Sequence, residues 1–363
     1  RPALSFPGKL TQLLKARYDA FQGAADSGLL IIPCELIEDN AAKLKALVLG
    51  HAASWYADPG FAAWLEKSCT WIDSLVDRIV TGFTAEERAA ILKAEGVEDE
   101  LVAVAEPYHL LALRGPESLD KILPLKAAGL NVVWALDISP WRELKVRLLN
   151  GSHTLIALAG LALGKKTVLE CVGDPLLMEA VRTYQLLETI PTIGGKASPI
   201  GRPEAEAYLS GVLERFSNPD LAHKLEGIAS KSVAKYAARI MPTVKAQFAI
   251  QGRAPVMASF ILAALVDRYT SGAVLQDEAA PVAWFEAHRA EFATPGGVAG
   301  PKAGAAMAEA LGPAGPWGDG KTGLPGQGNL AAEAVAWLGK IRGLGMGPAL
   351  TEAIAEAKRR QSG

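Results

Sequence analysis

The chain has 363 residues, half of them hydrophobic, and a formal net charge of −2. This length allows one large domain or two ordinary ones, and the near-neutral charge argues against a nucleic acid or an anionic membrane as a partner. The longest apolar runs are too short to span a bilayer, so we expect a cytoplasmic protein without a membrane partner. Three widely spaced cysteines indicate reduced thiols and neither a disulfide framework nor a zinc site: Cys34, Cys69 and Cys171.

The first third of the chain has the order of helices and strands that is typical of an α/β sheet. A helix is expected from Leu10 to Phe21, and the apolar run from Gly28 to Leu36 is of the kind found in a buried parallel strand. A helix from about Asn40 to Ala57 should follow. Further strands are expected at Tyr108–Leu113 and at Asn131–Leu136.

The segment Ser139–His153, SPWRELKVRLLNGSH, follows the last of these strands and combines a helical apolar stripe with three polar side chains. Its serine and proline suit the N-cap and the first position of a helix. At about 100° per residue, Asn150 lies roughly 140° and His153 roughly 80° from Lys145 around an α-helix, so one ligand could touch all three.

These residue types suit the reduction of a carbonyl group by hydride, in which the oxygen becomes an alkoxide. A lysine whose pKa is lowered toward neutrality by burial can supply the proton, and an asparagine amide can stabilise the developing charge. A histidine can hold a neighbouring hydroxyl group, and no metal is needed. The spacing alone leaves open the alternative of a surface lysine, a cap-like Asn-Gly pair and a half-buried histidine.

The block KVRLLNGSH resembles the signature of the polyol-specific long-chain dehydrogenases and reductases, the mannitol dehydrogenase family. The resemblance implies that Lys145 is the catalytic acid/base, that Asn150 stabilises the oxyanion and that His153 binds the substrate. It also implies NAD as the cofactor. Other blocks of the chain agree with the family in order, from about residue 5 to about residue 275.

The block CELIEDN, at the C-terminal end of the first expected strand, resembles the tagaturonate reductase branch of this family. The family takes a second oxyanion donor from this region, and Asn40 is the asparagine present; an N-cap for the next helix is an equally open interpretation. The resemblance further implies that Cys34, Glu35, Val76 and Asp77 lie beside the cofactor, and that Asp77 also lies beside the substrate. Apart from the resemblance, an Asp-Arg pair between apolar residues usually forms a structural salt bridge.

From residue 140 to about residue 290 the pattern is helical almost throughout. Within it, RFSNP (Arg215 to Pro219) resembles a family block, and Lys235 follows the arginine of this block by twenty residues, as a substrate-binding lysine does in the family. Mannitol dehydrogenase-type members carry an arginine eight residues before that lysine, where this chain has Gly227. The carboxylate of a sugar acid could pair with His223, Lys235 or Arg239, and a solvated helix face is the alternative.

The C-terminal region contains a Gly/Pro-rich segment, residues 294–329, that predicts loops around a short alanine-rich helix. Within it, Gly315 to Thr322 matches the P-loop pattern, but no apolar strand precedes it, so we expect no nucleotide site there. A closing pair of helices is expected from Leu330 to Arg360.

Together these features predict a Rossmann-like α/β dinucleotide-binding domain, incomplete at its N-terminus, over residues 1–138 and a mostly helical catalytic and substrate domain over residues 139–363. The Gly-rich turn that holds the pyrophosphate is expected upstream of Arg1. We expect an NAD-dependent oxidoreductase, a monomer or homodimer, that interconverts tagaturonate and altronate and binds no nucleic acid. A mannitol- or fructuronate-type dehydrogenase and a non-catalytic sugar-acid-binding remnant remain alternatives.

Overall fold

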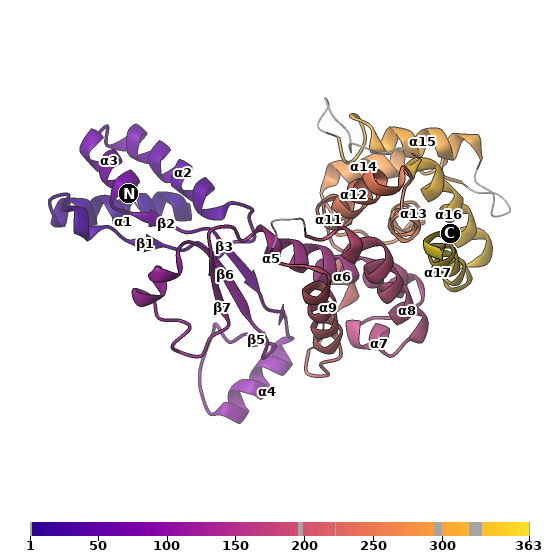
Figure 1. Cartoon of the computed structure of the whole chain (residues 1–363), viewed down its shortest axis with the longest axis horizontal. Coiled ribbons are helices and arrows are strands. Elements are labelled where there is room, and N and C mark those ends of the chain that lie inside the picture. The colour runs from indigo at the N-terminus through magenta and orange to yellow at the C-terminus, as the bar shows by residue number, and fades with distance from the viewer. Residues whose placement is uncertain (1, 195–198, 222, 294–299, 319–328, 363) are drawn as a thin grey trace. The chain divides into compact units, whose positions relative to one another are not determined.

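The computed structural model describes residues 2–194, 199–221, 223–293, 300–318 and 329–362, which fall into two compact units (Figure 1). The first unit consists of Arg1–Ile79 and Pro107–Arg142, and the second of Val80–Glu106 and Glu143–Gly363. The predicted domain boundary at residue 138 lies close to the last crossing between the units. In addition, the structure groups residues 80–106 with the helical unit.

The first unit is an α/β unit. Its extended segment Thr70–Asp77 contains β2 (Thr70–Trp71) and β3 (Ser74–Asp77), which pair with different strands. β1 (Leu30–Ile31) pairs in parallel with β2, and β3 pairs antiparallel with β6 (Leu110–Arg114). β6 also pairs in parallel with β7 (Val132–Ala135), so the two strands expected in this region are confirmed and the pairing is mixed.

The strand expected from Gly28 to Leu36 is much shorter than the apolar run suggested. Regular pairing covers only Leu30 and Ile31, and Pro33, which has no main-chain N–H, lies two residues beyond Ile31. Leu36 is 88% exposed, so the C-terminal part of this apolar run lies on the surface of a turn.

The strands of this unit form a two-stranded sheet, β1-β2, and a three-stranded sheet, β3-β6-β7, and side chains alternate between the two faces of the extended segment at β1. Leu29 and Ile31 face the helices, whereas Leu30 and Ile32 pack with Trp134 on the other side, as the period of two in a strand requires. The helices on the first face, which confirm both expected helices, are α1 (Phe6–Ala20), α2 (Asn40–Trp55) and α3 (Pro59–Lys67). Short 3₁₀ turns lie at Ala25–Ser27 and Glu117–Lys121, and α5 (Ser139–Glu143) follows β7.

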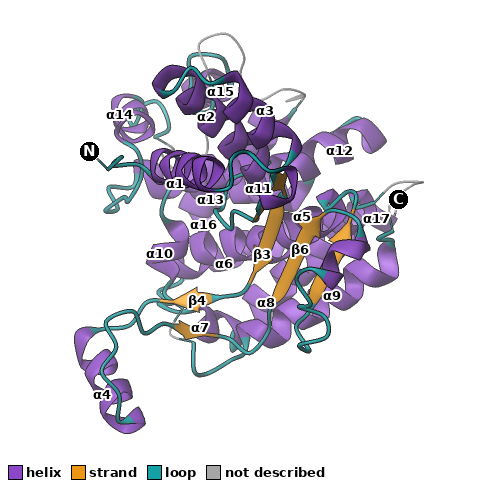
Figure 2. Ribbon diagram, turned by 90° about the vertical axis from the view of Figure 1, so that its left-hand side faces the viewer, coloured by secondary structure: helices purple, strands orange, loops and turns teal. Residues whose placement is uncertain are grey.

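The second unit begins with a short antiparallel pair, β4 (Val80–Thr81) and β5 (Val104–Ala105), from which α4 (Ala85–Glu95) extends (Figure 2). The other described elements of the unit are helical, as predicted. After a π-helical turn at Leu144–Leu149 come α6 (Asn150–Ala162), α7 (Val168–Val172), α8 (Pro175–Thr183), a second π-helical turn at Tyr184–Thr189, a 3₁₀ turn at Ile190–Thr192, α9 (Arg202–Phe216), α10 (Leu225–Ala229), α11 (Ser232–Arg239), α12 (Met241–Gln251), α13 (Val256–Thr270), α14 (Ala279–Ala287), α15 (Pro301–Leu311), α16 (Leu330–Leu344) and α17 (Met346–Ser362).

The core of the helical unit is α13, which is buried almost along its whole length, as its apolar sequence predicts. Buried Glu188 accepts the main-chain N–H groups of Met257 and Ala258 at 2.7 and 3.0 Å and so caps the first turn of α13. Within the described part of the chain, no helix is both long enough and apolar enough to cross a membrane.

The Gly/Pro-rich segment contains the predicted alanine-rich helix, α15. Residues 294–299 and 319–328 lie outside the described residues, and so does the second half of the P-loop-like block from Gly315 to Thr322. The described half of that block follows α15, a helix and not a strand. The closing helical pair is confirmed as α16 and α17.

Candidate active site

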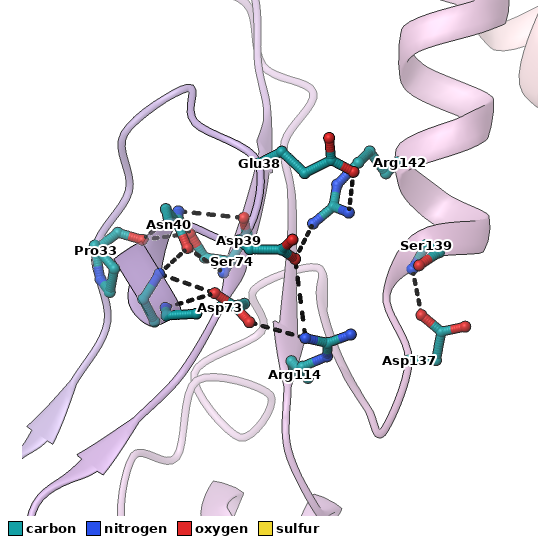
Figure 3. Close-up of polar contacts among 12 residues, drawn as sticks. Pro33, Glu38, Asp39, Asn40, Asp73, Ser74, Arg114, Asp137, Ser139 and Arg142 are labelled. Atoms are coloured by element: carbon teal, nitrogen blue, oxygen red, sulfur yellow. Dashed lines mark hydrogen bonds and ion pairs between the residues drawn. The ribbon is translucent and has the colours of Figure 1, made fainter. Parts of the chain in front are cut away.

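In the first unit, Asn40 holds the turn that leads from β1 into α2 (Figure 3). Its side chain is 4% exposed; Nδ2 donates to the carbonyl oxygen of Pro33 at 2.9 Å, and Oδ1 accepts the N–H of Ser74 at 3.1 Å. Because both ends of the amide are engaged inside the protein, this geometry favours a structural role at the start of α2 over the predicted role as an oxyanion donor. Asp39, and not Asn40, is the residue that precedes the helix.

Asp73, which no local sequence pattern singled out, holds the start of α2 (Figure 3). Its Oδ1 accepts the N–H of Ala41 at 2.8 Å and that of Ala42 at 3.3 Å, so it caps α2 from the link between β2 and β3. Its Oδ2 pairs with Nη1 of Arg114 at 3.0 Å. A cap that is supplied from 32 residues away leaves no local sequence signal.

The predicted cofactor-binding residues of this unit lie at the C-terminal ends of β1 and β3. Cys34 and Glu35 are exposed on the turn after β1, Val76 is half-buried, and Asp77, the last residue of β3, is 1% exposed. Arg142 forms ion pairs with two residues of the same turn (Figure 3), Glu38 at 3.2 Å and Asp39 at 4.0 Å.

The helix α5 begins at Ser139, whose N–H donates to the carboxylate of Asp137 at 2.9 Å. Asp137, and not the serine predicted as the N-cap, is therefore the hydrogen-bond acceptor at this helix start.

In the second unit, Lys145 and Asn150 are joined by the π-helical turn Leu144–Leu149, in which the N–H of Asn150 donates to the carbonyl oxygen of Lys145. The predicted separation of roughly 140° assumed an α-helix and is wrong, because an i→i+5 bond brings the two residues close to one full turn apart. His153 follows Asn150 by three residues on α6 and therefore lies on the same face. Lys145 and Asn150 are both partly exposed.

His153 is a buried imidazole with an unused nitrogen. It is 4% exposed, its ring stacks on Phe216 at 4.3 Å and meets His223 edge-on at 4.7 Å, and its Nε2 has no hydrogen-bond partner among the described residues. Burial, reinforced by His223, lowers the pKa of His153 well below its usual value. Burial and the charge of Lys235 lower the pKa of His223 to about 4, so both rings are neutral at pH 7.

Two cations one helical turn apart, Lys235 and Arg239 of α11, lie beside this group. Nζ of Lys235 donates to the carbonyl oxygen of Ile228 at 2.8 Å, and Nη1 of Arg239 contacts the carbonyl oxygen of Asn150 at 3.4 Å. Burial, followed by the charge of Arg239, lowers the pKa of Lys235 to about 8. In the part of the chain that the structure describes, neither cation forms an ion pair, although the carboxylate of Asp277 acts on Lys235 from a longer distance and opposes the fall of its pKa.

A buried ion pair anchors α9 behind the histidines. Arg215, 8% exposed, donates Nη2 and Nε to the carboxylate of Glu106 at 2.8 and 3.0 Å, and Glu106 is 1% exposed. Arg215 directly precedes Phe216, the residue that stacks on His153. The pair therefore fixes the wall against which the imidazole packs.

The predicted residues thus form two groups. Asn150, His153, His223, Lys235 and Arg239 are linked by contacts within the helical unit, and Lys145 adjoins them through the π-helical turn. Asn40, Cys34, Glu35, Val76 and Asp77 lie in the first unit. Among the described residues, no group of three or more histidine, cysteine or acidic side chains could hold a metal ion.

Comparison of the sequence with known proteins shows the family to which the chain belongs. Residues 4–127 match the family model of the mannitol dehydrogenase Rossmann domain, and residues 137–291 match that of the mannitol dehydrogenase C-terminal domain. The chain belongs to the mannitol dehydrogenase family. The Rossmann-type unit followed by a helical unit, as predicted from the sequence, is the arrangement of this family.

Similar curated members of the mannitol dehydrogenase family are altronate oxidoreductases. That of Bacillus subtilis (strain 168) is 38% identical over 286 residues, which cover 79% of this chain and 58% of the relative. That of Halalkalibacterium halodurans is 41% identical over 266 residues, 73% of this chain and 51% of the relative. The chain therefore spans between half and three fifths of the length of these relatives.

Solved structures support the same fold. D-sorbitol dehydrogenase in substrate-free form superposes with a TM-score of 0.72 at 21% identity, over 95% of this chain and 66% of that one. Mannitol 2-dehydrogenase of Pseudomonas fluorescens, in a ternary complex with NAD and D-mannitol, gives a TM-score of 0.71 at 21% identity, over 97% and 67%. A nicotinamide cofactor is consistent with the Rossmann unit of this family.

Proposed function

We propose that the chain is the catalytic part of an NAD-dependent oxidoreductase that interconverts tagaturonate and altronate in the cytoplasm, as the breakdown of hexuronates requires. The observation that carries the choice of a sugar acid is the pair Lys235 and Arg239, two cations without a carboxylate partner among the described residues, next to His153. Partly buried cations that form no ion pair favour an anionic ligand, since a carboxylate would supply the opposite charge at close range. The altronate oxidoreductases among the relatives support the same substrate class.

The residues of the helical unit can perform the proton transfer of this reaction. When it is bound, a nicotinamide cofactor would supply the hydride for the carbonyl carbon. Lys145 holds a proton on Nζ and gives it to the carbonyl oxygen, while Nδ2 of Asn150 donates a hydrogen bond to that oxygen as its charge develops. Neutral His153 offers its free Nε2 to a substrate hydroxyl group. In the reverse direction, Lys145 accepts the proton of the alcohol.

The first unit suits the nicotinamide end of the cofactor. The exposed turn with Cys34 and Glu35 and the end of β3 with Val76 and Asp77 lie at C-terminal strand ends, where open α/β sheets bind dinucleotides. We propose these four residues as the cofactor contacts of the chain, with Asp77 also near the substrate.

A substrate panel tests this proposal directly. The protein made from its complete gene should oxidise NADH with tagaturonate far faster than with fructuronate, and faster still than with the neutral ketose fructose. A preference for fructose would favour the mannitol-type alternative. No binding of NADH at millimolar concentration would favour a non-catalytic sugar-acid-binding protein.

The affinity for the sugar acid should depend on the charge of Lys235. Because burial lowers the pKa of this amine to about 8, it is protonated below that pH and loses its positive charge as the pH rises through it. We therefore expect the KM for tagaturonate to rise above pH 8, by up to about tenfold per pH unit. Steady-state kinetics from pH 6.5 to 9.5 measure this.

The matched control is Lys235→Arg, whose guanidinium stays protonated throughout this range. It should give a KM that changes little with pH, and the KM for fructose should be flat in both proteins. An equally steep rise in Lys235→Arg would assign the pH dependence to another group.

A further inference from the structure

A buried glutamine contacts the main chain of the π-helical turn that joins Lys145 to Asn150. Gln185 is 0% exposed, and its Nε2 lies 3.1 Å from the carbonyl oxygen of Arg147, 3.2 Å from that of Leu148 and 3.0 Å from Oγ of Ser152. Three oxygen atoms around one nitrogen fix the orientation of this amide, since only the NH₂ end can donate.

A donor of this kind can stabilise the main chain of a π-helical turn. A π-helical turn changes the register of the helix by one residue, so carbonyl groups at its ends lose regular helical partners, and buried carbonyl groups require a substitute. In an α-helix of the same sequence, Asn150 would be rotated by roughly 140° away from Lys145. The register of Leu144–Leu149 therefore decides whether the two side chains can reach one oxygen atom.

A second buried glutamine, Gln247, contacts the main chain of the second π-helical turn in the same way. Gln185 itself belongs to the second π-helical turn, Tyr184–Thr189, and Nε2 of Gln247 donates to the carbonyl oxygens of Glu188 at 2.6 Å and Leu187 at 3.4 Å. Gln247 is 2% exposed and lies on α12. Two buried glutamines thus connect α12 to the second turn and the second turn to the first.

We infer that Gln185 is a positioning residue for Lys145 and Asn150, because its buried amide holds Leu144–Leu149 in the π-helical register that sets both side chains on one face. Gln247 supports it by holding the turn on which Gln185 lies. The inference rests on the proposed function for its kinetic consequence and on the hydrogen bonds above for its structural one.

The test compares Gln185→Met with the wild-type protein. Methionine keeps the length of the side chain and removes both N–H donors. We expect kcat with tagaturonate to fall about 10- to 100-fold, as a displacement of about 1 Å can cause, while the KM stays within about threefold because Lys235 and Arg239 lie on α11. The pH profile of kcat should shift, and amide hydrogen exchange of residues 144–153 should become faster.

Two further variants keep the outcome interpretable. Ser259→Ala removes a buried hydroxyl that donates to the carbonyl oxygen of Pro255 at 2.7 Å on α13, and it should leave kcat and the exchange of residues 144–153 unchanged. Gln247→Met, which touches only the second turn, should lower kcat in the same direction and by less, and it serves if Gln185→Met does not fold.

The possible results separate the inference from the proposed function. A Gln185→Met protein with the kcat and exchange of Ser259→Ala would overturn the inference and leave the function intact. A wild-type protein without activity on any sugar acid would overturn the function. In that case faster exchange of residues 144–153 in Gln185→Met would still support the structural role, and unchanged exchange would refute it.

Discussion

Lys145→Ala is expected to lower kcat for the reduction of tagaturonate by about 10²- to 10⁴-fold, the usual contribution of a positioned general acid. The carbonyl oxygen would then have to take its proton from water. Binding should change little, because His153, Lys235 and Arg239 are unaffected. Added methylamine should restore part of the rate by supplying a diffusible ammonium group.

The measurement is NADH oxidation at saturating tagaturonate, with and without the amine. Lys245→Ala is the matched control, since Lys245 is an exposed lysine on α12 of the same unit, and it should leave kcat unchanged. A Lys145→Ala enzyme within a few-fold of the wild-type rate would remove this residue from the mechanism.

Arg215→Met is expected to destabilise the protein by about 3–5 kcal/mol, because it leaves the carboxylate of Glu106 buried without its cation. The prediction does not depend on the function. It follows from the burial of both partners, 8% and 1% exposed, and from their contacts at 2.8 and 3.0 Å. Urea unfolding followed by circular dichroism measures the change in the free energy of unfolding.

The same helix, α9, provides the control. Arg202 pairs with Glu206 at 2.7 Å, but the two side chains are 63% and 42% exposed, so Arg202→Met should cost about 1 kcal/mol or less. Equal losses in the two variants would show that the buried pair contributes no more than a surface pair.

Much of the fold followed from local patterns. The apolar face from Leu10 to Phe21 and the almost wholly apolar stretch around α13 predict helices that the structure contains. The strands were harder to predict, because an apolar run such as Gly28–Leu36 does not show which part pairs in a sheet and which part lies in an exposed turn. Only the contacts across to β2 decide where β1 ends.

The site was predictable where its residues lie close in sequence and not where it depends on distant partners. Lys145, Asn150 and His153 were found from one segment, but their spacing was converted to an angle with the wrong helix. The π-helical register depends on Gln185, 38 and 37 residues beyond the carbonyl groups of Arg147 and Leu148 that it contacts. Likewise, Asn40 resembled a donor by residue type, and its contacts with Pro33 and Ser74 show why the amide is already engaged.

The chain crosses between its two units three times, after residues 79, 106 and 142. A unit that is attached by one crossing can be exchanged between genes by a single end-to-end fusion. Here one breakpoint at residue 142 would leave the β4–β5 pair and α4 on the wrong side of the junction, severed from the helices with which they are grouped. Recombination that swaps substrate specificity between relatives must therefore carry residues 80–106 together with the C-terminal half, and chimaeras built from a single junction should be poorly folded.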